Sequence, residues 1–131
     1  MRLLVLSIIA ATLNLYSSHA KAADDEIANI SAAEVKLQDS AYVVLDVRTP
    51  AEFESGHIQG AVNVNINEES FSKRIATFDP SKTYIVHCAA NVPNGRSAKA
   101  IQVMQGLGFN QVLSLEGGVA AWTKAGRALV E

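Results

Sequence analysis

Cys88 is the only cysteine in the 131-residue sequence, and its surroundings suit a reactive thiol. A short apolar run precedes it. A polar loop without any acidic residue then leads to Arg96. Apolar residues at helical spacing follow from Ser97 onward. The groups that could carry chemistry are therefore a lone thiol and a nearby guanidinium. A helix is predicted to start directly after the guanidinium.

The loop after Cys88 could bind an anion through its backbone. A helix N-terminus offers unpaired N–H donors and a positive dipole end, and both favour negative charge and a lowered cysteine pKa. Gly95 can adopt a positive φ or allow close approach to the backbone, and Arg96 adds a permanent planar cation. Pro93 has no N–H group. The residues predicted to line this anion-binding loop are Ala89, Ala90, Asn91, Val92, Asn94, Gly95 and Arg96.

An acyl-transfer site, in which a general base activates the thiol, and a zinc site both fit the sequence less well. His87 directly precedes Cys88, and adjacent side chains on a strand point to opposite faces, so His87 is a poor general base for the thiol. One cysteine with the histidines His57 and His87 supplies too few ligands for a zinc site. We therefore expect a structural role for His87, no metal and no cofactor.

The elements that must position the thiol alternate between strand and helix patterns. Such alternation at short spacing predicts an α/β fold with a parallel sheet flanked by helices on both faces. Thr49, Pro50 and Gly56 have the spacing of a helix N-cap, first turn and stop, and Ser31 with Glu34 has the spacing of a capping box. Predicted strands span 41–47, 61–65, 83–88 and 111–115, and predicted helices span 32–38, 50–55, 67–78, 97–107 and 119–126.

This order places Cys88 at the carboxyl end of a strand, where open α/β sheets bind ligands. In the helix that follows, the apolar face is predicted to contain Ala98, Ile101, Met104 and Leu107. Trp122, among alanines on the last helix, is predicted to be a core residue.

The N-terminus has the pattern of a cleavable signal peptide. Arg2 precedes an apolar run from Leu3 to Leu15, and Ala20-Lys21-Ala22 fits a small-x-small cleavage site. We expect residues 1–22 to be removed and residues 23–131 to form one periplasmic or secreted domain. The net charge is −2 without a Lys/Arg cluster, which argues against binding to nucleic acid, or to a membrane after cleavage. An unpaired cysteine in an exported protein indicates a reactive thiol or an intermolecular bridge.

Three segments together resemble the rhodanese family. "LDVRTPAEFESGHIQGAVNV" and "VLSLEGGVAAWTKAG" are similar to its two signatures, and between them "YIVHC" and "GRSAKAIQVMQGLGF" flank the position of its catalytic loop. The resemblance implies a single-domain sulfurtransferase in which Cys88 takes a sulfane sulfur as a persulfide and Arg96 helps to bind the donor. A small anionic donor, of the thiosulfate or polysulfide type, and a thiol, cyanide or protein acceptor are implied as well.

The remaining signature residues are expected to be structural. Asp46 and Arg48 flank a strand end, where they could pair with each other or support the loop, and a scaffolding role is favoured. Glu52 and His57 are likewise expected to belong to the turn and helix framework.

The loop departs from the family pattern in length. Active members commonly resemble C-x-x-G-x-R-S, whereas here the arginine lies eight places after the cysteine, and Asn91 stands where a glycine would be. Related phosphatases and arsenate reductases of this fold place the arginine six positions on. A cysteine phosphatase or arsenate reductase therefore stays as an alternative, as does a non-catalytic sulfur carrier or binding module.

Overall fold

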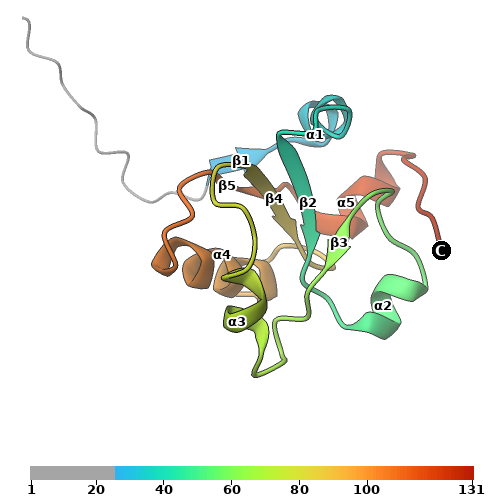
Figure 1. The fold of residues 1–131 in the computed structure, drawn as a ribbon. Helices are drawn as coiled ribbons and strands as arrows, with labels where there is room; N and C mark the ends of the chain where they lie inside the picture. Colours follow the sequence, from blue (N-terminus) through green and yellow to red (C-terminus); the bar gives the residue numbers. More distant parts are fainter. Residues whose placement is uncertain (1–25) are drawn as a thin grey trace, which may run out of the picture.

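A single five-stranded sheet organises the molecule (Figure 1). The computed structural model describes residues 26–131, so the predicted signal peptide and its cleavage site lie outside the described residues. All strands are parallel, in the order β1-β5-β4-β2-β3. The strands are β1 (Glu26–Ala28), β2 (Tyr42–Asp46), β3 (Val62–Asn63), β4 (Thr83–His87) and β5 (Val112–Leu115). The helices are α1 (Ile30–Lys36), α2 (Pro50–Glu54), α3 (Phe71–Ile75), α4 (Arg96–Gly106) and α5 (Gly118–Lys124).

Apolar layers cover both faces of the sheet, as predicted. On one face, Leu45 and Val86 pack against α3 and α4 through Ile75 and Ile101. On the other, Val44 and Ile85 belong to a second cluster with α1 and α5. Neighbouring residues of β2 and β4 therefore face opposite layers, which is why both strands read as continuous apolar runs. Trp122 lies in the second cluster and is buried, which confirms its predicted core position.

The central strands bring the candidate site to one edge of the sheet. Asp46 at the end of β2 lies opposite His87 at the end of β4. The N–H of Val47 donates to the carbonyl of His87 at 3.0 Å, which extends the pairing one residue further. Cys88 follows directly after β4, so the predicted position of the thiol at a strand carboxyl end is confirmed.

Several boundaries differ from the prediction. Strand β1 was not predicted, because three residues are too short to show an alternation and the strand is held only by pairing with β5. Helix α1 begins at Ile30, not after Ser31, and its first backbone bond runs from the N–H of Ala33 to the carbonyl of Asn29, a residue type favoured at N-caps.

Helix α3 is shorter than the predicted 67–78. The Asn65 side chain accepts a hydrogen bond from the N–H of Asn67 at 3.0 Å, and this local turn competes with helical bonding. In α4 the buried face contains Ser97, Ala100, Ile101 and Met104, whereas Leu107 at the C-cap is 43% exposed, so the predicted face is displaced around the helix.

Candidate active site

The Cys88 thiol is buried at the start of the loop that joins β4 to α4. Only 4% of the residue is exposed. Burial disfavours the thiolate, but hydrogen bonds from the hydroxyl and N–H of Ser97 and from the N–H groups of Asn91 and Ala90 outweigh it, so the pKa of Cys88 lies below its ordinary value. This residue therefore has the electrostatic surroundings of a nucleophile.

Ser97 is a site residue that the sequence analysis missed. It lies in the first turn of α4, it is 2% exposed, and its Oγ atom is 3.5 Å from the Sγ atom of Cys88. Its place in the first turn of the helix that follows the thiol loop is the sequence signal that could have identified it. A hydroxyl and an N–H group from one residue thus both point at the sulfur.

The loop backbone surrounds the thiol less completely than predicted. Ala90 and Asn91 direct N–H groups to the sulfur, but the N–H of Gly95 donates to the carbonyl of Val92 at 3.0 Å. Gly95 has φ of −80°, so no positive φ explains it. A Cβ atom there would lie 2.9 Å from the Val92 carbonyl oxygen, so the close approach is to the loop itself.

Asn91 fixes the loop through its side chain. Its φ of +48° is in the left-handed region, which glycine and asparagine adopt most readily, and this accounts for asparagine at the glycine position of the family pattern. Its Oδ1 atom accepts from the N–H of Cys88 at 2.8 Å, and its Nδ2 atom donates to the Ser114 hydroxyl at 3.0 Å and to the Leu115 carbonyl. The side chain therefore ties the loop to the end of β5.

Helix α5 holds the start of the loop by backbone bonds. The N–H of Val119 donates to the carbonyl of Cys88 at 3.1 Å, and that of Ala120 donates to the carbonyl of Ala89 at 2.9 Å. This approach requires Gly118, which has φ of +62° and where a Cβ atom would lie 2.6 Å from the Cys88 carbonyl oxygen. The sequence around Gly117 and Gly118 is typical of a turn, and nothing local signals a contact with a loop 30 residues away.

Arg96 is held by an acidic residue from α2. Its guanidinium forms two bonds to Glu52, 2.6 Å from NH1 to Oε2 and 3.0 Å from NH2 to Oε1. The hydrogen bond from Arg96 lowers the pKa of Glu52 to about 2. The predicted scaffolding role of Glu52 is therefore incomplete, since it also positions and neutralises the one cation of the loop.

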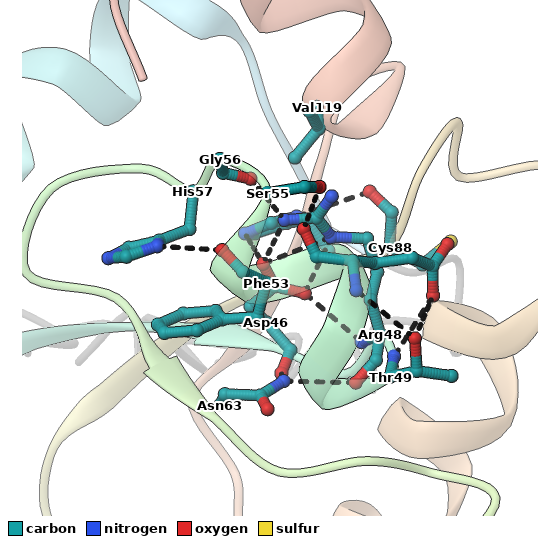
Figure 2. Close-up of polar contacts among 12 residues, drawn as sticks. Asp46, Arg48, Thr49, Phe53, Ser55, Gly56, His57, Asn63, Cys88 and Val119 are labelled. Atoms are coloured by element: carbon teal, nitrogen blue, oxygen red, sulfur yellow. Dashed lines mark hydrogen bonds and ion pairs between the residues drawn. The ribbon is translucent and has the colours of Figure 1, made fainter. Parts of the chain in front are cut away.

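Asp46 and Arg48 pair with each other, one of the two arrangements that the sequence left open (Figure 2). The Arg48 NH2 atom lies 2.7 Å from Asp46 Oδ2 and also donates to the Gly56 carbonyl at 2.9 Å. Both side chains are buried. Asp46 also approaches His87, the residue before the thiol, whose Nε2 atom is 3.8 Å from Asp46 Oδ2.

His87 is a buried structural residue. Its Nδ1 atom lies 3.2 Å from the Cys88 carbonyl oxygen, and its side chain is fully buried in the layer opposite the thiol. Burial lowers the pKa of His87, which favours the neutral ring at physiological pH. His57 stacks on Phe53 with ring centroids 3.7 Å apart and belongs to the α2 framework.

A cavity of about 370 Å³ lies beside the thiol loop. Asn91 and Ser97, which both contact the Cys88 sulfur, form part of its wall. The rest of the wall comes from Val92, Pro93, Asn94, Ala98, Gln102 and Ser114, so no side chain that lines the cavity is charged. The predicted loop residues Val92 and Asn94 thus face this cavity.

Two negative findings concern the described residues, 26–131. No group of three or more histidine, cysteine, aspartate or glutamate side chains there could hold a metal ion. No helix in this part of the chain is long and apolar enough to cross a membrane.

Comparison with known proteins identifies the family. Thiosulfate sulfurtransferase 16, chloroplastic, from Arabidopsis thaliana is 37% identical over 92 residues, which cover 63% of this chain and 74% of that protein. Thiosulfate sulfurtransferase GlpE from Shewanella oneidensis is 34% identical over 82 residues, covering 63% and 76%.

Solved structures agree with these sequence relatives. A crystal structure of a rhodanese-related protein from Thermoplasma volcanium is similar with a TM-score of 0.68 and 31% identity, covering 80% of this chain and 97% of that one. Residues 30–125 match the family described as the rhodanese-like domain. The chain therefore belongs to the rhodanese-like family.

Proposed function

We propose that this protein is a sulfurtransferase that carries sulfane sulfur as a persulfide on Cys88. The observation that carries the proposal is the position of this buried thiol at the end of β4, with the Ser97 hydroxyl 3.5 Å from its sulfur. Burial raises the pKa of Cys88, but hydrogen bonds from Ser97 and from the N–H groups of Asn91 and Ala90 hold it below its ordinary value. Sulfur exchange needs a thiolate and a place for a negative sulfur, and it needs neither a general base nor a metal. The site offers both requirements.

The reaction proceeds by two displacements on sulfur. The Cys88 thiolate attacks the outer sulfur of a thiosulfate or polysulfide-type donor, the donor's S–S bond breaks, and sulfite or a shortened polysulfide leaves with the electron pair. A thiol or cyanide then attacks the outer sulfur of the persulfide and restores the Cys88 thiolate. The same N–H groups that lower the thiol pKa would stabilise the persulfide anion.

The remaining loop residues would support this chemistry in different ways. Ala89 anchors the start of the loop to α5, whereas Val92, Asn94 and Gly95 shape the wall of the cavity or the turn above it. Asp46 and Arg48 would act as supporting residues by holding the ends of β2 and α2 together.

The proposed setting is the periplasm or the extracellular space. It rests on the signal-peptide pattern of residues 1–22. The proposed partners are small anionic sulfur donors and thiol, cyanide or protein acceptors. N-terminal sequencing of the exported protein should begin at Ala23. An intact Met1 on a cytosolic protein would contradict this part of the proposal.

The phosphatase and arsenate reductase alternatives fit the site less well. Both chemistries use an arginine that is free to bind an oxyanion, whereas Arg96 is bonded to Glu52 through two nitrogens. No acidic residue lies between Cys88 and Arg96 to protonate a leaving group. A sulfur-carrier role uses the same persulfide and differs only in turnover.

Mass spectrometry of the intact protein after incubation with polysulfide tests the proposal. The wild-type protein should gain one sulfur atom, and the Cys88→Ser variant should gain none. Repeated turnover with cyanide or a thiol would distinguish an enzyme from a carrier. Cys88-dependent hydrolysis of an aryl phosphate, without any gain of sulfur, would overturn the sulfurtransferase proposal.

A further inference from the structure

Arg96, the cation at the end of the thiol loop, is paired with an acidic residue. Glu52 accepts hydrogen bonds from the N–H of Thr49 at 3.0 Å and from its hydroxyl at 2.9 Å, so the carboxylate is oriented by α2 itself. Arg96 then binds both carboxylate oxygens. The capping box of a short helix therefore places a fixed negative charge against the guanidinium at the start of α4.

The charge of Arg96 bears on the thiol because Arg96 directly precedes Ser97, whose Oγ atom is 3.5 Å from the Sγ atom of Cys88. The pKa of Arg96 is raised chiefly by the hydrogen bond to Glu52 and also by the negative charge of the Cys88 thiolate. With Glu52 ionised, the pair contributes no net charge to the site. The N–H dipoles and the Ser97 hydroxyl are then the groups directed at the sulfur.

The cavity beside the loop supplies no replacement charge. Its wall combines apolar groups of Val92, Pro93 and Ala98 with the amides of Asn94 and Gln102. Neither amide side chain is hydrogen-bonded to another described residue, so both are available to a ligand. Such a wall suits the organic part of a molecule and gives no Coulombic attraction to a dianion.

We propose that Glu52 is a specificity-determining residue, and that by holding Arg96 it makes the site favour organic sulfane-sulfur donors over the thiosulfate dianion. This inference rests on the proposed function, because it concerns the donor for the Cys88 persulfide. A dianion that enters a partly buried site without a free cation loses hydration that N–H dipoles replace only in part. An organic donor with a single negative charge loses less, and its apolar part gains contacts in the cavity.

Benzenethiosulfonate and thiosulfate make a matched pair of donors to test this. In both, the Cys88 thiolate attacks the outer sulfur and the S–S bond breaks, releasing benzenesulfinate from one and sulfite from the other. Both reactions use the same thiolate, so a change in the thiol pKa affects both donors alike. The ratio of their kcat/KM values, with cyanide as acceptor, therefore isolates how the site treats donor charge and size.

The wild-type protein should favour benzenethiosulfonate. Glu52→Gln keeps a side chain that can cap α2 and frees the charge of Arg96, so it should shift the ratio toward thiosulfate by about tenfold. Glu54→Gln removes the same charge from an exposed position on α2 and should leave the ratio unchanged. The double variant Glu52→Gln/Arg96→Gln restores a neutral pair and should return the ratio to the wild-type value.

Different results overturn different claims. Wild-type preference for thiosulfate, or an equal shift in Glu52→Gln and Glu54→Gln, would overturn the role of Glu52. If Glu52→Gln does not fold, Arg96→Gln, which leaves the Glu52 carboxylate unpaired, should shift the ratio further toward benzenethiosulfonate, and an unchanged ratio would overturn the role of the pair. Absence of any Cys88 persulfide with every donor would instead refute the proposed function.

Discussion

The Oγ atom of Ser97 lies 3.5 Å from the Sγ atom of Cys88, at the junction of β4 and α4. The N–H of the same residue also stabilises the thiolate. Because α4 begins at Arg96, the start of this helix fixes both donors relative to the strand that carries the thiol. The surroundings of the Cys88 thiol are thus set by the way in which a strand end and a helix start are joined.

Ser97→Ala should therefore weaken the thiolate. Burial raises the pKa of Cys88 and the hydrogen bonds lower it, so removing one of them should move the pH profile of persulfide formation to higher pH. At neutral pH the rate should fall by about tenfold, as expected for a lost hydrogen bond to a charged group. Ser72→Ala on the exposed surface of α3 is the matched control. An unshifted profile in Ser97→Ala would contradict this role of the hydroxyl.

Asn91→Ala should be more destabilising than Asn94→Ala. Both residues have positive φ, but only the Asn91 side chain bonds to Cys88, Ser114 and Leu115. The first change should cost about 3 kcal/mol in the free energy of unfolding, and the second about 1 kcal/mol for the backbone alone. Urea denaturation measures the free energy of unfolding of both variants. Equal losses of stability would show that the Asn91 side chain does not hold the loop.

Gly118→Ala should displace the thiol loop. The added Cβ atom would lie 2.6 Å from the Cys88 carbonyl oxygen, whereas at Gly126, which also has positive φ, nothing lies within 4 Å. Gly126→Ala should cost only about 1 kcal/mol of backbone strain and leave persulfide formation intact. Gly118→Ala should cost at least about 2 kcal/mol more and slow sulfur uptake. Equal stability of the two variants in thermal denaturation would refute the close contact.

Asp46→Asn should leave a buried guanidinium without its counter-ion. Loss of one partner of a buried ion pair costs about 3–5 kcal/mol, so the variant should unfold at much lower urea concentration. The double variant Asp46→Asn/Arg48→Met removes the unpaired charge and should recover a large part of that loss. A double variant no more stable than the single one would argue against the charge as the cause.

The parts of this site that the sequence predicted are those determined by neighbouring residues. The Thr49 cap depends on residues three positions apart, and the position of Cys88 follows from the apolar run before it and the helix pattern after it. Strands β2 and β4 were recognisable because both their faces are buried.

Contacts between distant segments could not be predicted in this way. Glu52 and Arg96 are 44 residues apart, and each also fits a purely local role, as a helix cap or as the end of a loop. Gly118 looks like any turn glycine until α5 is placed against the Cys88 carbonyl. The three-residue strand β1 likewise depends on β5 and has no pattern of its own.

The most direct test of the account is a single-turnover reaction of Cys88. The protein is incubated with polysulfide, freed of excess donor, weighed by intact mass spectrometry and then mixed with cyanide. We predict one added sulfur atom for each Cys88, and cyanide should remove it as one equivalent of thiocyanate, with neither event in Cys88→Ser. A protein that gains no sulfur, or gains it equally in Cys88→Ser, would contradict the account.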